Sequence, residues 1–223
     1  MHTDFFHPER TREGSSPERV GLILVRTVRM TILLVVAIAL AGCDSAPVSD
    51  SWHDPVFHGP IRFHRTLVIA MTPDVLVRRP AEDVMVAEIG EGRSIQSYKL
   101  LTSADLYDVE HLVQKLTPNG VDAILTMRLV PTKHDVSWVP GSGVYPFDPF
   151  WTFYDRAWST ARDPAALKNE TTVRVQTNLY TVEGGKLLWT GISDSFLAAD
   201  ARERIEPVVR GIGSRMEAEG LLR

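Results

Sequence analysis

The chain has 223 residues, of which 44% are hydrophobic and 23% are charged. These fractions are typical of globular proteins and exclude a disordered or collagen-like chain, and the single cysteine excludes a disulfide framework and any metal site built from clustered cysteines. The net charge of −4 and the pI near 6.0 give no electrostatic footprint for nucleic acid, so we expect no nucleic-acid partner.

The N-terminal part of the sequence is typical of a targeting signal. The apolar run over residues 31–41 is shorter than the roughly 20 residues that a membrane-spanning helix needs, but it has the length of the apolar part of a secretory signal. Arg26 and Arg29 supply the basic residues that precede such a run. We therefore expect residues 1–42 to be a signal peptide, and we interpret residues 1–29 as an over-extended start.

The four residues that end this segment, Leu40-Ala41-Gly42-Cys43, resemble the bacterial lipobox. The resemblance implies that a diacylglyceryl group is attached to the Cys43 thiol, that the chain is cleaved before Cys43, and that the new amino terminus is acylated, for example with palmitate. Several acyl chains anchor a protein stably, since each buried CH₂ contributes about 0.8 kcal/mol. The alternative is that Cys43 is a buried structural residue in an N-terminal helix.

Asp44 follows the expected lipidation site. In lipoproteins of enteric bacteria, an aspartate at this position resembles an inner-membrane retention signal. The rule differs between bacteria, so we expect a membrane-anchored lipoprotein that faces the periplasm, with the choice between inner and outer membrane left open. Residues 43–60 comprise the lipidated Cys43 and a stretch rich in Ser, Asp, Pro and His, which predicts a tether.

Residues 61–223 predict one α/β domain. Residues 65–72 form an almost continuous apolar run, typical of a strand buried on both faces. A helix is expected over residues 80–92, with Pro80 in its first turn, followed by a strand over residues 94–101.

A second helix is expected to begin at Ser103 and to end before Asn119-Gly120. Residues 121–130 then predict a central strand, because nearly every residue is apolar. The short connections up to this point favour a layered α/β domain.

Polar and apolar residues alternate cleanly over residues 171–181, which predicts a strand. Residues 183–186 are typical of a hairpin turn, and residues 187–195 predict the partner strand. A last helix is expected over residues 199–219. We therefore predict an α/β two-layer sandwich with a mixed sheet of about five strands and about three helices on one side.

A segment rich in proline and aromatic residues, 139–164, interrupts this order. No helical or strand period is evident there, so we expect a long excursion. Three interpretations stay open: the segment covers the sheet, contacts a partner, or touches the membrane interface. The candidate partner-contact residues are Tyr145, Phe147, Phe150, Trp151, Phe153, Tyr154 and Trp158.

Several strings occur in a familiar order over residues 65–221: V-I-A-M, S-Y-K-L-L, G-V-D-A-I-L-T-M-R-L and T-V-R-V-Q-T-N-L-Y-T-V-E-G-G-K-L-L-W-T-G. Together they resemble a family of uncharacterised bacterial lipoproteins. The domain of this family is similar to the N-terminal α/β domain of the Tol-system propeller protein and to the periplasmic part of the curli-secretion lipoprotein. The resemblance implies an envelope role and supplies no catalytic residues. The curli-secretion lipoprotein also has membrane-spanning strands, and the sequence has no comparable pair left over, which argues against pore formation.

The sequence lacks the phosphate-loop, dinucleotide, zincin and hydrolase-elbow motifs. His53, His58 and His64 fall close together, but their spacing fits no rigid face, so a polar linker is favoured over a zinc or copper site. Acidic residues at 105, 108 and 110 form a possible acid–base group, but their place at the start of a helix favours an interaction with the helix dipole.

We therefore expect no enzymatic activity, no cofactor and no bound metal. The expected function is that of a lipid-anchored interaction or accessory module in the cell envelope, held to the membrane by its lipid and bound to an envelope protein. Two alternatives stay open: an enzyme of envelope polymers without a recognisable motif, and a subunit of an oligomeric export assembly.

Overall fold

The structure is a computed structural model that describes residues 48–57, 60, 62–132, 149–163 and 171–222. Cys43, Asp44, Tyr145 and Phe147 lie outside the described residues, as do the signal peptide and the first residues of the expected tether.

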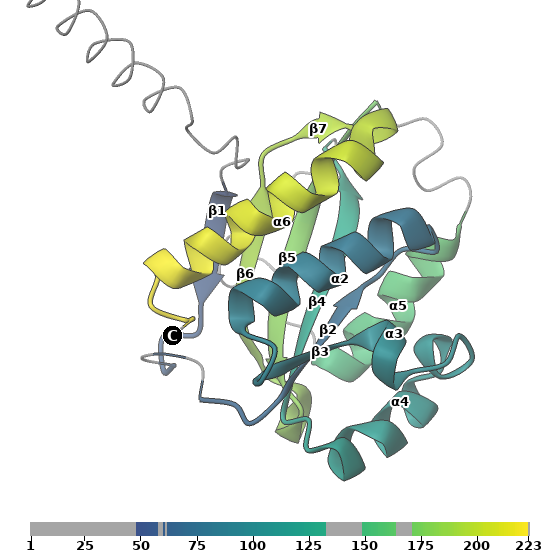
Figure 1. The fold of residues 1–223 in the computed structure, drawn as a ribbon, viewed down its shortest axis with the longest axis vertical. Coiled ribbons are helices and arrows are strands. Elements are labelled where there is room, and N and C mark those ends of the chain that lie inside the picture. Colours follow the sequence, from purple (N-terminus) through teal and green to yellow (C-terminus); the bar gives the residue numbers. More distant parts are fainter. Residues whose placement is uncertain (1–47, 58–59, 61, 133–148, 164–170, 223) are drawn as a thin grey trace, which may run out of the picture. The chain divides into compact units, whose positions relative to one another are not determined.

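One mixed sheet organises the domain, with the strand order β1-β6-β5-β4-β2-β3 and with β7 paired to β5 (Figure 1). β2 runs parallel to β3 and β4, and the other neighbouring pairs are antiparallel. The strands are β1 (Val48–His53), β2 (Thr66–Ala70), β3 (Ser94–Gln96), β4 (Ala123–Pro131), β5 (Thr172–Thr181), β6 (Leu187–Ser193) and β7 (Phe196–Leu197). The predicted α/β class with a mixed sheet is confirmed, with more strands than expected.

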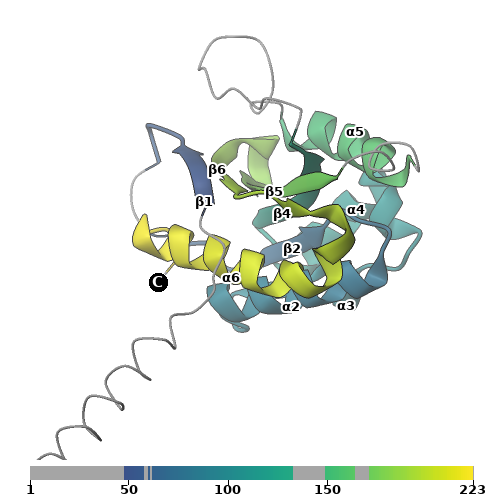
Figure 2. The ribbon, with the colours of Figure 1, turned by 90° about the horizontal axis from the view of Figure 1, so that it is seen from above.

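Helices cover both faces of this sheet, whereas the sequence predicted them on one side. α2 and α6 pack on one face, and α4 and α5 pack on the other (Figure 2). The helices are α2 (Val75–Ile89), α3 (Ser97–Leu100), α4 (Val109–Leu116), α5 (Phe150–Arg162) and α6 (Ala201–Ala218). Short 3-10 turns are η1 (Asp105–Tyr107), η2 (Thr117–Asn119), η3 (Glu183–Gly185) and η4 (Ala198–Asp200). The predicted two-layer arrangement is thereby corrected to three layers.

The composition of β2 explains the third layer. Every residue of this strand is buried. Val68 and Ala70 belong to the apolar cluster beneath α2 and α6, whereas Leu67 and Ile69 belong to the cluster beneath α4 and α5. A strand with apolar side chains on both faces needs cover on both faces, because leaving one face in water forfeits its burial.

Within the aromatic segment, the described residues 149–163 contain α5, which forms part of the second cover and corrects the expectation of an irregular excursion there. Phe150, Phe153, Tyr154 and Trp158 lie in α5 at helical spacing and are buried in the cluster beneath α4 and α5. The Tyr154 hydroxyl donates to the carbonyl of Leu106 at 2.6 Å, which satisfies its buried oxygen. These four residues are core, and the interpretation as partner contacts is wrong for them.

The helix boundaries also differ from the prediction. α2 begins before Pro80, because the Asp74 carboxylate accepts a hydrogen bond from the backbone N–H of Leu76 at 2.9 Å and caps the helix. It ends at Gly90, whose φ of 107° favours glycine. The expected strand over residues 94–101 stops after β3 and continues as α3.

β1 corrects the length of the tether, since Val48–His53 forms an edge strand antiparallel to β6. Glu219, which follows α6, accepts hydrogen bonds from the Ser51 hydroxyl, from the Trp189 indole at 2.7 Å and from Arg215. Burial on its own raises the pKa of Glu219, but these hydrogen bonds and the charge of Arg215 bring the pKa below its usual value. β1 is thus joined to both the sheet and the C-terminal helix.

The different burial of two tryptophans in α5 predicts that their replacement lowers the free energy of unfolding by different amounts. Trp158→Ala removes a side chain that is 1% exposed and should lower the free energy of unfolding by about 3–5 kcal/mol. Trp151→Ala, in the same helix, should cost clearly less, because Trp151 is only partly buried. Urea denaturation of both variants measures the difference, and equal losses would contradict the assignment of Trp158 to the core.

Candidate functional site

A hollow of about 420 Å³ lies where β1 ends. It lies between the end of β1, the η3 turn and the residue before α5. Its lining residues are Trp52, Asp54, Pro149, Gly184, Gly185, Lys186 and Leu187. We call this region the hollow.

An ion pair between Asp54 and Lys186 dominates the charge of the hollow. Asp54 is 5% exposed, and its carboxylate also accepts the backbone N–H of Val56 at 2.9 Å. The hydrogen bond from Lys186, followed by that from Val56, holds the pKa of Asp54 below its usual range. Asp54 is therefore a fixed negative charge at neutral pH, and is poorly suited to transfer protons.

Trp151 lies beside the hollow and packs against η3. A Cβ atom built on Gly185 would lie 3.0 Å from the Trp151 indole nitrogen, so the ring sits directly on this glycine. Gly185 also has a φ of 60°, which a residue with a side chain rarely adopts. Among the candidate aromatic residues that the structure describes, Trp151 keeps partial exposure. The rim of the hollow thus offers indole rings and a cation, side chains that are enriched in binding interfaces.

A second polar cluster surrounds Glu82 of α2, at the end of β2. Its carboxylate accepts hydrogen bonds from the Ala70 N–H at 3.0 Å, from the Ser97 hydroxyl at 2.6 Å and from the Tyr98 N–H at 3.4 Å. Burial raises the pKa of Glu82 to about 7, although these hydrogen bonds and the charge of Arg78 act in the opposite direction. Such a pKa suits a general acid or base, but Glu82 is 0% exposed and cannot meet a substrate in this structure.

A third polar group lies on the α5 side of the sheet and was missed from the sequence. Asn178 accepts a hydrogen bond from Thr190 at 2.6 Å and donates one to the Tyr180 hydroxyl at 2.9 Å, while Arg128 donates to Gln176 at 2.9 Å. The alternation in β5 does predict that Gln176, Asn178 and Tyr180 share one face, but not that this face is buried. Because these groups bond to one another, they fix the register of β4, β5 and β6.

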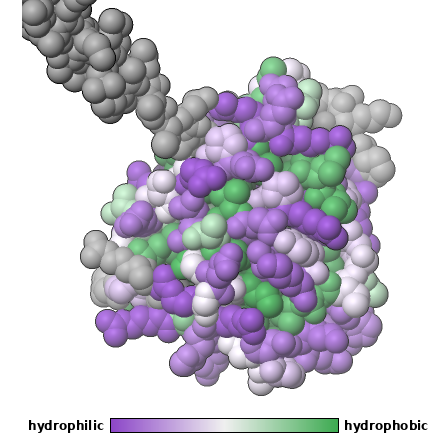
Figure 3. Space-filling view, in the orientation of Figure 1, coloured by the Kyte–Doolittle hydropathy of each residue, from purple (hydrophilic) through white to green (hydrophobic). Residues whose placement is uncertain are grey.

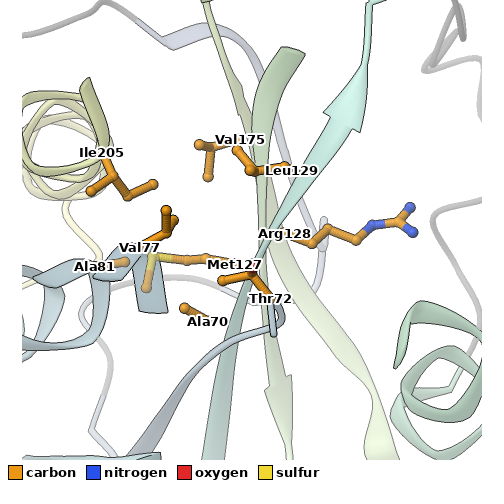
Figure 4. Close-up of a pocket in the computed structure, with 9 residues that line it drawn as sticks. All are labelled: Ala70, Thr72, Val77, Ala81, Met127, Arg128, Leu129, Val175 and Ile205. Carbon is orange, nitrogen blue, oxygen red and sulfur yellow. The ribbon is translucent and has the colours of Figure 1, made fainter. Parts of the chain in front are cut away.

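A small void of about 10 Å³ lies between α2, α6 and the other face of the sheet (Figure 4). Apolar side chains line most of it, including Val77, Met127 and Ile205, and Figure 4 shows Arg128 pointing away from it. A space of this size holds at most one water molecule, and it offers few polar partners. The void is a packing gap and not a ligand site.

The remaining sequence candidates have structural roles where they are described. Asp108 accepts the N–H groups of Glu110 and His111 and so caps α4, which confirms that Asp108 and Glu110 lie at a helix start. The expected start at Ser103 is wrong, because α4 begins at Val109 and Asp105 lies in η1. His58 and His134 lie outside the described residues. Within the described ranges there is no group of three or more side chains suited to hold a metal ion. In the same part of the chain, no helix has the length and hydropathy that crossing a membrane requires.

Comparison with known proteins leaves the family open. No family model matches the chain, and no curated protein matches it. Among solved structures, the PelC dodecamer from Paraburkholderia phytofirmans is similar at 9% identity and a TM-score of 0.40, covering 78% of this chain and 97% of that chain. A point variant of that dodecamer is similar at 11% identity and a TM-score of 0.35, with 74% and 98% covered. A likeness of this size does not extend the properties of those proteins to this chain, and the resemblance to a lipoprotein family stays a prediction.

The buried carboxyl group of Glu82 predicts a pH-dependent stability. Glu82 binds its proton more tightly in the folded chain than in the unfolded chain, so its contribution is complete below pH 4.5 and is lost as the pH rises to about 7. Over this interval the free energy of unfolding should fall by about 3 kcal/mol more in the wild type than in Glu82→Gln, which cannot ionise. Urea denaturation at several pH values measures this. A wild-type slope in Glu82→Gln would refute the prediction.

Proposed function

We propose that this chain is a lipid-anchored, non-enzymatic module that faces the periplasm and binds an envelope partner at the hollow. Its anchor is Cys43, as the lipobox resemblance implies. Membership in the family of uncharacterised envelope lipoproteins is part of this proposal. It rests on the order of strings in the sequence.

The observation that carries the proposal is the place of β1 in the sheet. Val48, at the start of β1, lies opposite Ser193 at the end of β6, and His53 lies opposite Trp189 near the start of β6. Val48 is the described residue nearest to Cys43 in the sequence, and it lies at one end of the sheet. The hollow, which begins at Trp52 and Asp54, lies at the other end. The hollow and Val48, the described residue closest in sequence to the proposed anchor, thus lie at opposite ends of β1.

The titratable groups support a binding module over an enzyme of envelope polymers. The carboxyl group that is tuned towards neutral pH, Glu82, is sealed inside the domain. The carboxyl group that lines the hollow, Asp54, is locked as a charge by Lys186. General acid–base catalysis needs both properties in one group, namely a suitable pKa and access to the substrate.

The anchor predicts a processing defect in Cys43→Ser. Without the thiol, the chain should remain an uncleaved and unacylated precursor, whereas the wild type should incorporate labelled palmitate and lose residues 1–42. Metabolic labelling and mass spectrometry of the N-terminal peptide measure both events. Normal processing of Cys43→Ser would refute the anchor.

The hollow predicts a partner that can be captured beside η3. A photo-reactive phenylalanine at Glu183, an exposed residue of η3, should give a discrete protein adduct in living cells. The matched control is the same residue at Val113, which is 43% exposed on α4. Lys186→Glu should weaken the adduct, because it places two negative charges side by side at Asp54. Adducts of equal yield at Glu183 and Val113, or none at either, would refute the hollow as the binding surface.

A further inference from the structure

The end of the sheet where β1 starts carries several other segments. Val48 pairs with Ser193, the last residue of β6, and the chain continues from there into β7. Leu197 of β7 lies opposite Thr172 at the start of β5. β4 pairs with the other side of β5, and the end of β4 lies beside the start of β5. β2 runs parallel to β4, so β2 ends towards the same end of the sheet, and from there the chain enters α2. The first residues of β1, β7 and the first turn of α2 thus lie towards one end of the sheet, with β1 at the left, β7 at the top and the start of α2 at the right in Figure 1.

Exposed apolar side chains lie at this end. Val75 and Leu76, in the first turn of α2, are 42% and 59% exposed, and Leu197 of β7 is 48% exposed. Figure 3 shows hydrophobic surface at the upper right of the domain, over the start of α2. We call Val75, Leu76 and Leu197 the apolar edge. Asp74, which directly precedes α2, pairs with Arg202 at the start of α6 at 3.0 Å.

Exposure alone does not distinguish this edge. Val56 and Val113 are also exposed, at 79% and 43%, and single apolar residues on a surface are normal. Both lie away from the apolar edge: Val56 follows the end of β1, and Val113 belongs to α4, which leads through η2 towards the start of β4. What sets the apolar edge apart is that it lies at the same end of the sheet as the start of β1, although β6, β5 and β4 lie between β1 and β2.

Covalent geometry keeps this end of the sheet close to the expected anchor. Only five peptide units join Cys43 to Val48, and they span at most about 18 Å when fully extended. The tether expected from the sequence, reaching residue 60, spans about 60 Å. Because β1 belongs to the sheet, the distance from the anchor to the start of α2 is limited by this link and by the four strand spacings of about 4.8 Å from β1 to β2. A short link of this kind gives an effective concentration in the millimolar range. Weak apolar contacts suffice for association at such concentrations.

We propose that the apolar edge rests on the surface of the bilayer that holds the acyl chains of Cys43, with Leu76 and Leu197 at the level of the lipid headgroups. This inference rests on the proposed lipid anchor. The edge contributes apolar area at the boundary between headgroups and acyl chains, where amphipathic surfaces bind. The contact fixes the orientation of the domain, so that the hollow at the other end of β1 points into the periplasm.

The test uses introduced cysteines in the full chain, isolated from bacterial membranes. Cys43 is the single cysteine of the sequence, and acylation blocks its thiol, so Leu76→Cys and Leu197→Cys each provide one free thiol for a bimane fluorophore. The labelled proteins are reconstituted into vesicles of phosphatidylethanolamine and phosphatidylglycerol with doxyl-labelled lipid. Quenching of bimane by the doxyl group should be about threefold stronger at Leu76 and Leu197 than in the matched controls Val56→Cys and Val113→Cys.

A longer link provides a second control. A Gly-Ser insertion of about 12 residues before Val48, with a root-mean-square span of about 20 Å, should bring quenching at Leu76 and Leu197 towards the control values. Weak quenching at all four positions in acylated protein, or stronger quenching at Val56 or Val113, would overturn the proposed contact and leave the anchor intact. A chain that carries bimane on Cys43 itself is not acylated, and that result would overturn both the anchor and the contact.

Discussion

The structure depends on a sheet whose central strands are apolar on both faces. β2 is buried along its whole length, and β4 is buried along most of it, so neither strand tolerates an uncovered side. α2 and α6 supply one cover, and the aromatic side chains of α5 together with α4 supply the other. The role of α5, the described part of the aromatic segment, is therefore fixed by the strands that it covers, because the burial of those strands drives the fold.

Polar groups inside the domain join elements that are distant in sequence. Glu82 joins α2 to the end of β2 and to the start of α3. Asn178 joins β5 to β6 through Thr190. Glu219 joins the end of α6 to β1 and β6. Groups of this kind stabilise one register over others, since a buried polar atom without its partner costs about 1–3 kcal/mol. Glu82, whose pKa is raised by burial to about 7, is therefore a structural group inside the domain.

The two ends of the sheet carry different surfaces, which is the physical basis of the proposed function. The start of β1 and the exposed apolar side chains of α2 and β7 lie at one end, and the other end opens into the hollow with its ion pair and indole rings. Between them lies the sheet with helices on both faces. In the proposed function, these two surfaces would orient a partner relative to the membrane, because the geometry of the sheet sets where each surface points.

The sequence by itself determined the elements whose signal is local: the apolar runs of β2 and β4, the alternation of β5, its hairpin with β6, and the stripe of α6 with Ile205, Val209 and Ile212 in the core. The spacing of Phe150, Phe153, Tyr154 and Trp158 also fits one helical face, and this signal was obscured by the flanking prolines and by Trp151. Only the tertiary structure decided that the polar segment of β1 is a strand, that the polar face of β5 is buried, and that residues from three separate segments form the hollow. The physical reason is that periodicity reports which face of a single element is apolar, whereas strand pairing and the cover of a face depend on partners that are distant in the chain.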